Sequence, residues 1–270
     1  MDDLELFKKV LTASAYPESA YRIEQISDSK SPAHKFRNFI VRTLRKQNKL
    51  LVKKREFNAA DRDEGKDWPM FGYTMVGHKR LDNVQHAIET ILEKDIPGDF
   101  VECGVWRGGC AMFMKAMLNT RGDTERRIWL ADSFAGLPKP NESEFPDDTG
   151  YDYTDQDILA VPMETVKANF DRFDLLDARV EFLPGWFKDT LPDAGIGQIA
   201  LLRADGDLYE STIQILDNLY DKVAPGGFVI IDDYKSWPPC KKAVDEFRAR
   251  HGIDAPIHDV DWTGVYWIKP

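Results

Sequence analysis

The sequence has few cysteines, and their arrangement predicts neither a disulfide framework nor a zinc site. The three cysteines, Cys103, Cys110 and Cys240, are scattered along 270 residues and lack the paired spacing of zinc ligands. The N-terminal segment MDDLELFKKVL begins with acidic residues and contains no long apolar run, so neither a secretory signal nor a membrane span is predicted there. We therefore expect reduced thiols and a cytoplasmic location.

Several common functional motifs are also missing. There is no G-x-S-x-G element and no P-loop, which excludes the simplest hydrolase and nucleoside-triphosphate-dependent functions. A formal net charge of −10 disfavours binding to nucleic acid or to an anionic membrane. The histidines show no metal-ligand spacing, so no role is assigned to His78, His86, His251 or His258.

What the sequence does contain is a globular composition arranged as alternating strands and helices. Hydrophobic residues make up 43% and charged residues 30% of the chain. Alternation of strands and helices predicts βαβ units and a mostly parallel sheet. Strands are expected at 99–104, 127–132, 180–185, 199–205 and 228–233, and GVYWIKP (264–270) is expected as a last strand at the edge or inserted beside its neighbour.

The N-terminal part has a different character. From Lys30 to Arg55 it is rich in basic residues, and a helical spacing predicts one amphipathic helix through Phe36, Phe39, Ile40, Thr43, Leu44 and Leu51. This helix could dock on the same chain or on a second copy. It could instead cover the active site or lie on a membrane surface, although the net charge argues against the membrane. Residues 61–69 are polar and end in Trp68–Pro69, which predicts a linker. We expect a helical extension or lid at 1–72 and one main domain at 73–270.

The first candidate site is ECGVWRGG (102–109), where a strand ends and a helix begins. Glycines at such a turn let a ligand approach the backbone, and a helix N-terminus favours negative charge. The glycine spacing here differs from the G-x-G-x-x-G of dinucleotide-binding proteins, which disfavours a nicotinamide-dependent dehydrogenase. A tight turn that requires glycine for packing alone is the alternative.

A second candidate is Asp132, the last residue of the next predicted strand. An acid at this place can accept hydrogen bonds from both hydroxyls of a ribose, although it could also cap the following turn. Apolar and aromatic residues near other strand ends could enclose an adenine or a methionine arm. They lie in Gly185–Trp186–Phe187 and in Tyr73–Thr74–Met75–Val76, and each taken singly could equally belong to the core.

The densest polar group consists of four carboxylates at two successive strand ends. Asp205 and Asp207 close one strand, and Asp232 and Asp233 close the next. The carboxyl ends of parallel strands open onto one crevice, so these side chains could converge. Unpaired, they would repel one another, and a Mg²⁺ ion would resolve the conflict because it prefers oxygen ligands. A solvated acidic rim is the alternative.

Together these residues resemble the macrocin O-methyltransferase family. The resemblance covers most of the chain from Thr74 onward, in the strings TMVGHKRLDN, VECGVWRGG, LADSFAGLP, LLDARVEFLPGWFKDTLP, LRADGDLYEST, PGGFVIIDDY and DWTGVYWIK. It implies a class I methyltransferase fold, which is a Rossmann-like α/β fold with a mostly parallel sheet and helices on both faces, here with an N-terminal helical extension. It also implies S-adenosyl-L-methionine over the carboxyl ends of the strands, with Mg²⁺ beside it.

The resemblance implies roles for individual residues as well. Asp205, Asp232 and Asp233 would ligate the metal, Asp207 would be the general base, Asp132 would hold the ribose and Trp186 would lie near the adenine. The expected cofactor-binding set is Thr74, Met75, Glu102, Gly104, Trp106, Arg107, Gly108, Asp132, Ser133, Gly185, Trp186, Phe187 and Asp205.

The expected reaction is methyl transfer to a hydroxyl of a small molecule. Two adjacent hydroxyls would chelate a metal well, so a sugar diol or a catechol is expected, and the family favours a sugar of a glycosylated natural product. A non-catalytic S-adenosylmethionine-binding module is a further alternative. A homo-oligomer formed through the N-terminal helices is also expected to be possible.

Overall fold

The computed structural model of the chain describes residues 3–17, 21–23, 31–47, 49, 51–54, 56–67 and 69–270. Its main sheet is built from β3 (Asp99–Cys103), β4 (Ile128–Asp132), β5 (Val180–Pro184), β6 (Ile199–Ala204), β7 (Val223–Ile231), β8 (His258–Asp259) and β9 (Val265–Ile268). The seven strands lie in the order β5-β4-β3-β6-β7-β9-β8. β3 to β7 run parallel, whereas β9 is antiparallel to β7 and β8 is antiparallel to β9. The predicted α/β class with a mostly parallel sheet is thus confirmed.

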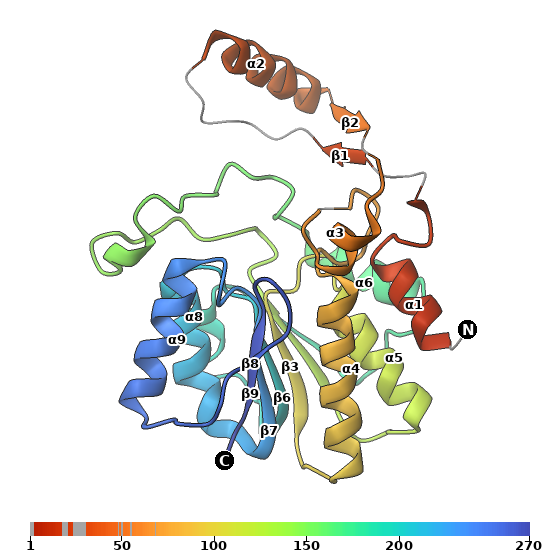
Figure 1. Ribbon diagram of the computed structural model, residues 1–270, viewed down its shortest axis with the longest axis vertical. Coiled ribbons are helices and arrows are strands. Elements are labelled where there is room, and N and C mark those ends of the chain that lie inside the picture. Colours follow the sequence, from red (N-terminus) through yellow and green to blue (C-terminus); the bar gives the residue numbers. More distant parts are fainter. Residues whose placement is uncertain are drawn as a thin grey trace.

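Helices cover both faces of this sheet (Figure 1). One face packs against α4 (His78–Glu93), α5 (Gly109–Arg121) and α6 (Met163–Asp171), and the other against α8 (Tyr209–Leu219) and α9 (Pro238–Arg250). Neighbouring residues of one strand serve opposite faces, since Phe100 belongs to the first apolar cluster and Val101 to the second. This two-sided burial is what a parallel sheet requires. The shorter helices are α7 (Phe187–Thr190), η2 (Pro146–Asp148) and η3 (Tyr220–Lys222).

The five predicted parallel strands agree with the structure within a few residues, apart from β7, which begins five residues earlier, at Val223. The last predicted strand is β9, which is inserted between β7 and β8. β8 was not predicted. It comprises two exposed residues, His258 and Asp259, and is too short to show an alternating apolar pattern.

The helical extension predicted at 1–72 begins with α1 (Asp3–Leu11), for which no separate bounds were predicted. Its Leu4 and Leu11 are buried in the same apolar cluster as α4 and α5. The division into residues 1–72 and 73–270 therefore stays a proposal, with α1 packed into the core of the second part. None of the described helices has the length and apolarity that crossing a bilayer requires.

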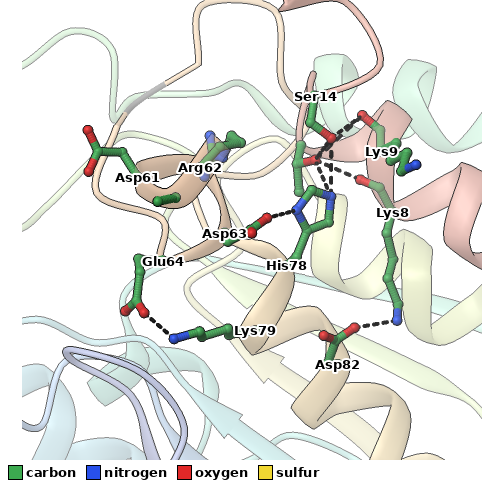
Figure 2. A network of polar contacts seen from close by, with 12 residues as sticks. Lys8, Lys9, Ser14, Asp61, Arg62, Asp63, Glu64, His78, Lys79 and Asp82 are labelled. Carbon is green, nitrogen blue, oxygen red and sulfur yellow. Dashed lines mark hydrogen bonds and ion pairs between the residues drawn. The ribbon is translucent and has the colours of Figure 1, made fainter. Parts of the chain in front are cut away.

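Polar contacts at the start of α4 fasten α1 and α3 (Ala59–Asp63) to the main domain (Figure 2). Nδ1 of His78 lies 2.8 Å from the Asp63 carboxylate. Nε2 of His78 lies 3.2 Å from the Thr12 hydroxyl and 3.1 Å from the Ser14 hydroxyl. One imidazole at the N-terminus of α4 therefore joins three segments.

The predicted helix at 30–55 is shorter than expected. α2 spans Pro32–Lys46, begins at the N-cap Ser31, and closes at Gln47 and Lys49, whose N–H groups both bond to the Leu44 carbonyl. Leu51 lies outside the helix and directly precedes β2 (Val52–Lys54), which pairs with β1 (Tyr21–Ile23). Residues 30, 48, 50 and 55 of the predicted helix lie outside the described residues. The helix end was predicted too late because basic residues continue beyond Lys46 and no glycine or proline follows the helix there.

The prediction of a linker at 61–69 was also wrong in part. Asp61 to Asp63 belong to α3, because the Asn58 side chain accepts hydrogen bonds from the N–H groups of Ala60 and Asp61 and so caps a helix. Trp68 lies outside the described residues.

Candidate active site

The site forms where the order of the strands reverses. From β3 the chain fills the sheet through β4 and β5 on one side, and later through β6 and β7 on the other. In such sheets the crevice at the carboxyl ends of the two central strands is where ligands bind. Here Gly104 follows β3 and Asp205 follows β6.

Gly104 brings these two strand ends into contact. Its φ angle is 85°, and a Cβ atom at this position would lie 2.0 Å from the backbone oxygen of Asp205. No other residue type fits both the conformation and the space. The packing role of this glycine and its role in shaping a site are therefore one and the same.

Two adjoining cavities open at this edge of the sheet. The first, of about 270 Å³, includes five predicted cofactor residues in its lining: Asp132, Ser133, Gly185, Trp186 and Phe187. The second, of about 400 Å³, is lined by four others and by the whole acidic group: Thr74, Met75, Glu102, Trp106, Asp205, Asp207, Asp232 and Asp233. Gly104 and Asp205 line both cavities, so the two meet at the crevice between β3 and β6.

Two residues of the expected cofactor set lie elsewhere. Arg107 stacks on the Trp106 ring at 4.2 Å and donates hydrogen bonds to the carbonyls of Met70 and Gly72. A Cβ atom at Gly108 would lie 2.8 Å from a methyl group of Val166 in α6. Neither residue is among those described as lining the two cavities. Their contacts stabilise the turn and do not form part of either cavity wall.

Asp132 performs the turn-capping role that was its structural alternative. Its Oδ2 accepts a hydrogen bond of 2.6 Å from the N–H of Val105, and its Oδ1 accepts one of 2.7 Å from the N–H of Phe134. The backbone N–H of Trp106 also bonds this carboxylate, whereas the nearby Ser133 hydroxyl donates to the Gly136 carbonyl at 2.7 Å. The two oxygens carry four lone pairs in all, so at least one lone pair can still accept from a ligand in the first cavity. The two interpretations of Asp132 are compatible.

The four aspartates divide into a group of three and a fourth with its own partners. Asp205, Asp207 and Asp233 each offer a carboxylate oxygen within 4.8 Å of the others. Asp232 instead contacts Arg203 through Oδ1 at 2.5 Å and Arg80 through Oδ2. Two guanidinium groups therefore surround this one carboxylate.

Arg203 forms ion pairs with carboxylates from three neighbouring strand ends of the crevice. It is buried, and it contacts Glu102 at 2.8 Å, Asp205 at 2.9 Å and Asp232. Arg80 extends the same network to Asp261 at 2.9 Å. The guanidinium group of Arg203 thus contacts Glu102, which lies just before the glycine turn, and two carboxylates of the acidic group.

The pKa values of the four aspartates show the electrostatic cost of burying them close together. Burial, followed by the neighbouring carboxylates, raises the pKa of Asp207 and of Asp233 well above the usual range, and the pKa of Asp205 is also raised. Burial would raise the pKa of Asp232 too, but Arg203 and Arg80 outweigh it and hold that pKa below its usual value. The pocket disfavours ionised Asp207 and Asp233 until more positive charge is added.

The donor set fits a divalent cation. Three carboxylate oxygens converge, and they are the hard ligands that Mg²⁺ prefers. Oδ2 of Asp233 is buried and has no partner of good hydrogen-bond geometry among the described residues, and the Asp205 and Asp233 carboxylates are close enough to share a proton. Buried polar atoms are ordinarily satisfied, and either a shared proton or a cation would satisfy this oxygen.

The sequence model of the macrocin-O-methyltransferase (TylF) family matches residues 1–269. The chain belongs to this family. It is 54% identical over 204 residues to the 8-demethyl-8-(2,3-dimethoxy-alpha-L-rhamnosyl)-tetracenomycin-C 4'-O-methyltransferase of Streptomyces olivaceus, covering 75% of this chain and 78% of that one. It is 44% identical over 222 residues to the mycinamicin III 3''-O-methyltransferase of Micromonospora griseorubida, covering 81% and 87% of the two chains.

Solved structures agree with this assignment. The O-methyltransferase NovP superposes with a TM-score of 0.85 at 41% identity, covering 99% of this chain and 98% of that one. The calicheamicin methyltransferase CalS11, at 23% identity and a TM-score of 0.57, covers 89% and 94% of the two chains and shares the fold. The protein is therefore an O-methyltransferase with the class I, S-adenosylmethionine-dependent fold.

Some residues of this O-methyltransferase site were not predicted from the sequence. Tyr153, Trp237 and Trp262 line the second cavity, and the rings of Tyr153 and Trp237 lie 5.2 Å apart. Trp237 follows the Asp232–Asp233 pair so closely that its position near a strand end could have indicated it. Arg80 gave no local signal, since it lies 152 residues from Asp232. The buried acids alone implied that a counter-charge must come from somewhere.

Proposed function

We propose that this enzyme transfers a methyl group from S-adenosyl-L-methionine to a sugar hydroxyl of a glycosylated natural product, with Mg²⁺ at the acidic group. The observation that carries the proposal is that the acidic group and the cofactor turn share one crevice, joined at Gly104 and Asp205. One relative is named for methylating a rhamnosyl-tetracenomycin C and another for methylating mycinamicin III, which supports the acceptor class.

The cofactor would occupy the first cavity and reach into the second. Asp132 would accept from the ribose hydroxyls, and Trp186 and Phe187 would lie against the adenine. Glu102 would bind the ammonium group of the methionine moiety. Supporting this, Oε1 of Glu102 is held by Arg203 while the buried Oε2 has no partner of good hydrogen-bond geometry among the described residues, the N–H of Ala111 being the nearest donor to the carboxylate.

We assign Asp205, Asp232 and Asp233 as metal ligands and Asp207 as the general base. Asp232 keeps a second lone pair on each oxygen beside its two arginines, so it remains able to ligate. When bound, the metal would lower the pKa of the acceptor hydroxyl. The carboxylate of Asp207, ionised once the metal supplies the missing positive charge, would take the hydroxyl proton. Glu102, Asp132 and Trp186 would hold the methyl donor in line with that hydroxyl.

The close grouping of Asp207 with Asp205 and Asp233 defines the experiment, because the reverse assignment would make Asp207 a ligand. We expect Asp232→Asn to weaken Mg²⁺ binding in titration calorimetry by at least about tenfold. Asp207→Asn should retain Mg²⁺ binding and lose about 10²- to 10⁴-fold in kcat, the usual contribution of a general base. Loss of Mg²⁺ binding in Asp207→Asn alone would reverse the two roles, and full activity in EDTA would remove the metal from the proposal.

The acceptor class has its own test. Purified enzyme is incubated with isotopically labelled S-adenosyl-L-methionine and a panel of glycosylated metabolites, free sugars and catechols, and products are identified by mass spectrometry. We expect label on glycosides. Preferential labelling of catechols would favour a catechol-type enzyme, and cofactor binding without any turnover would favour a non-catalytic binding module.

We also propose that copies of this chain associate through α2. Phe36 and Phe39 lie on one face of α2 and are 67% and 66% exposed. Residues 30–55 contain ten Lys and Arg and no Asp or Glu, although the whole chain has a formal charge of −10. A basic helix with an apolar face complements the acidic remainder of a second copy.

A further inference from the structure

One long connection forms a wall of both cavities. We name residues 133–162, between β4 and α6, the cover loop. Gly136 to Lys139 and Asn141 line the first cavity, Tyr153 and Leu159 line the second, and Leu137 lines both. Figure 1 shows this connection reaching far out from the sheet, above α8 and α9. Its position must be fixed for either cavity to keep its shape.

The helix that follows Asp207 has no side-chain cap of its own at its N-terminus. α8 begins at Tyr209, two residues after Asp207, and its N-cap residue Leu208 offers no side-chain hydrogen bond. The first N–H groups of a helix have no partner within the helix, and a leucine cannot supply one. The first turn of α8 therefore needs an acceptor from another part of the chain.

Asp148 in the cover loop is that acceptor. Its Oδ1 accepts a hydrogen bond of 2.7 Å from the N–H of Tyr209, and its Oδ2 accepts one of 3.0 Å from the N–H of Glu210. The residue has no exposed surface. Hydrogen bonds to an ionised acceptor are about twice as strong as neutral ones, and a carboxylate suits the positive end of the helix dipole.

The residue next to Asp148 provides a natural comparison. Asp147 forms an ion pair of 2.8 Å with Lys242, and both side chains are partly exposed. Such surface pairs contribute little to stability. Two adjacent carboxylates of the cover loop thus differ in kind: one is buried on a helix terminus and the other lies on the surface.

The first turn of α8 in turn fixes the end of β6. Asp207 has a φ angle of 55°, in the left-handed region that few non-glycine residues other than asparagine and aspartate adopt. A Cβ atom at Gly206 would lie 3.2 Å from the backbone N of Thr212 in α8, so the turn is packed directly against the helix. Any displacement at the start of α8 would therefore displace Asp207.

We propose that Asp148 is a positioning residue, which locks the cover loop onto the first turn of α8 and thereby holds the cavity walls and Asp207 in one arrangement. The role of Asp207 in this proposal rests on the proposed function, whereas the locking of the cover loop does not. The lock and the role of Asp207 can therefore be tested separately.

The experiment compares Asp148→Ala, Asp148→Asn and the control Asp147→Ala by hydrogen exchange and by calorimetric binding of S-adenosyl-L-methionine alone. In Asp148→Ala we expect faster exchange at 137–159 and at Tyr209 and Glu210, and a dissociation constant raised about tenfold, which corresponds to about 1.4 kcal/mol. Asp148→Asn keeps one acceptor oxygen and should lie between Asp148→Ala and the wild type. Asp147→Ala should resemble the wild type.

The proposal is overturned if exchange in the cover loop of Asp148→Ala equals that of Asp147→Ala. Circular dichroism first establishes that each variant is folded. If Asp148→Ala does not fold, Asp148→Asn decides: faster exchange confined to the cover loop and the start of α8 supports the lock, and wild-type exchange there overturns it. None of these readouts requires the acceptor or Mg²⁺, so failure of the proposed reaction would leave them unaffected.

Discussion

At the scale of single residues, the crevice depends on where each buried charge finds a partner. The Glu102 carboxylate is buried, and one of its oxygens accepts a hydrogen bond from Arg203. Burial raises its pKa to about 8 despite that arginine. The same burial that prepares Glu102 for a cationic ligand makes its ionised form costly when no ligand is bound.

This cost gives a pH-dependent prediction. The unfolded chain releases the Glu102 proton near pH 4.5, whereas the folded chain without ligand holds it to about pH 8. The stabilising contribution is therefore present below the lower value and is lost as the pH rises through the higher one. We expect Glu102→Gln, which carries no charge, to gain in melting temperature relative to the wild type between about pH 5 and pH 8. A difference that stays constant over this range, measured without cofactor or metal, would contradict the assigned pKa.

A second residue-scale prediction concerns Gly104. Replacing it by alanine adds a Cβ atom 2.0 Å from the Asp205 backbone oxygen at a φ of 85°. We expect Gly104→Ala to lower the free energy of unfolding by about 2–3 kcal/mol or more, since backbone atoms must move. Gly122→Ala is the matched control, because Gly122 has a φ of 72° but an added methyl group there would meet nothing within 4 Å. Equal losses in urea unfolding would show that conformation alone, and not the contact with Asp205, requires the glycine.

At the scale of elements, the N-terminal segments depend on a few polar contacts with α4. His78 receives the Asp63 carboxylate on one nitrogen and two hydroxyls on the other, and Lys8 of α1 contacts Asp82 at 2.5 Å (Figure 2). Asp63 accepts from Nδ1–H, and the Thr12 hydroxyl donates to the Lys8 carbonyl at 2.9 Å. In the neutral imidazole the single lone pair of Nε2 is therefore left to accept from the Ser14 hydroxyl. The imidazole fits this position because it donates from one nitrogen and accepts at the other.

We expect His78→Ala to destabilise the docking of α1 and α3 by about 1–2 kcal/mol. Hydrogen exchange should become faster in α1 while the sheet stays protected, because α1 is held by fewer contacts than the strands. Lys79→Ala is the control: Lys79 forms an ion pair with Glu64 on the same turn, but the lysine is exposed and should contribute little. Wild-type exchange of α1 in His78→Ala would show that Leu4 and Leu11 hold it unaided.

The elements also show what the sequence could and could not predict. β3 to β7 were predictable because buried parallel strands form short apolar runs, and the strand-end acids followed because such ends share an edge. α1 was expected only as part of a helical extension at 1–72, and no local pattern showed that its apolar residues pack into the core of the main domain. Long-range partners could not be predicted: Arg80 contacts Asp232 across 152 residues, and Asp148 caps the Tyr209 N–H across 61 residues, and no local pattern records such contacts.

At the scale of the whole molecule, charge is unevenly distributed. The basic stretch at 30–55 includes α2, whereas the acidic group, the cover loop and the rest of the chain carry the negative excess. In Figure 1 α2 lies apart from the sheet, beyond the carboxyl ends of its strands. Arg45 of α2 nevertheless reaches Asp157 of the cover loop at 2.7 Å.

The proposed association through α2 predicts a change in molar mass. We expect wild-type enzyme to form an oligomer in light scattering, and the double variant Phe36→Ser, Phe39→Ser to shift toward the monomer because an apolar contact is lost. Raising the salt concentration should act in the same direction by screening the basic helix. The control is Leu6→Ser, which alters a residue of α1 that is 50% exposed. A monomeric wild type, or a double variant with unchanged mass, would exclude α2 as the contact.

The aromatic wall of the second cavity has a practical consequence. Tyr153, Trp237 and Trp262 belong to three separate connections, the cover loop, the segment after β7 and the turn before β9, and none of them lies in a strand of the sheet. The cover loop also lines the first cavity, whereas of these two cavities the segments that carry Trp237 and Trp262 line only the second. With the acceptor in the second cavity, as proposed, chimaeras that graft a relative's versions of these two segments and retain the cover loop should accept that relative's alcohol while keeping their own affinity for the methyl donor.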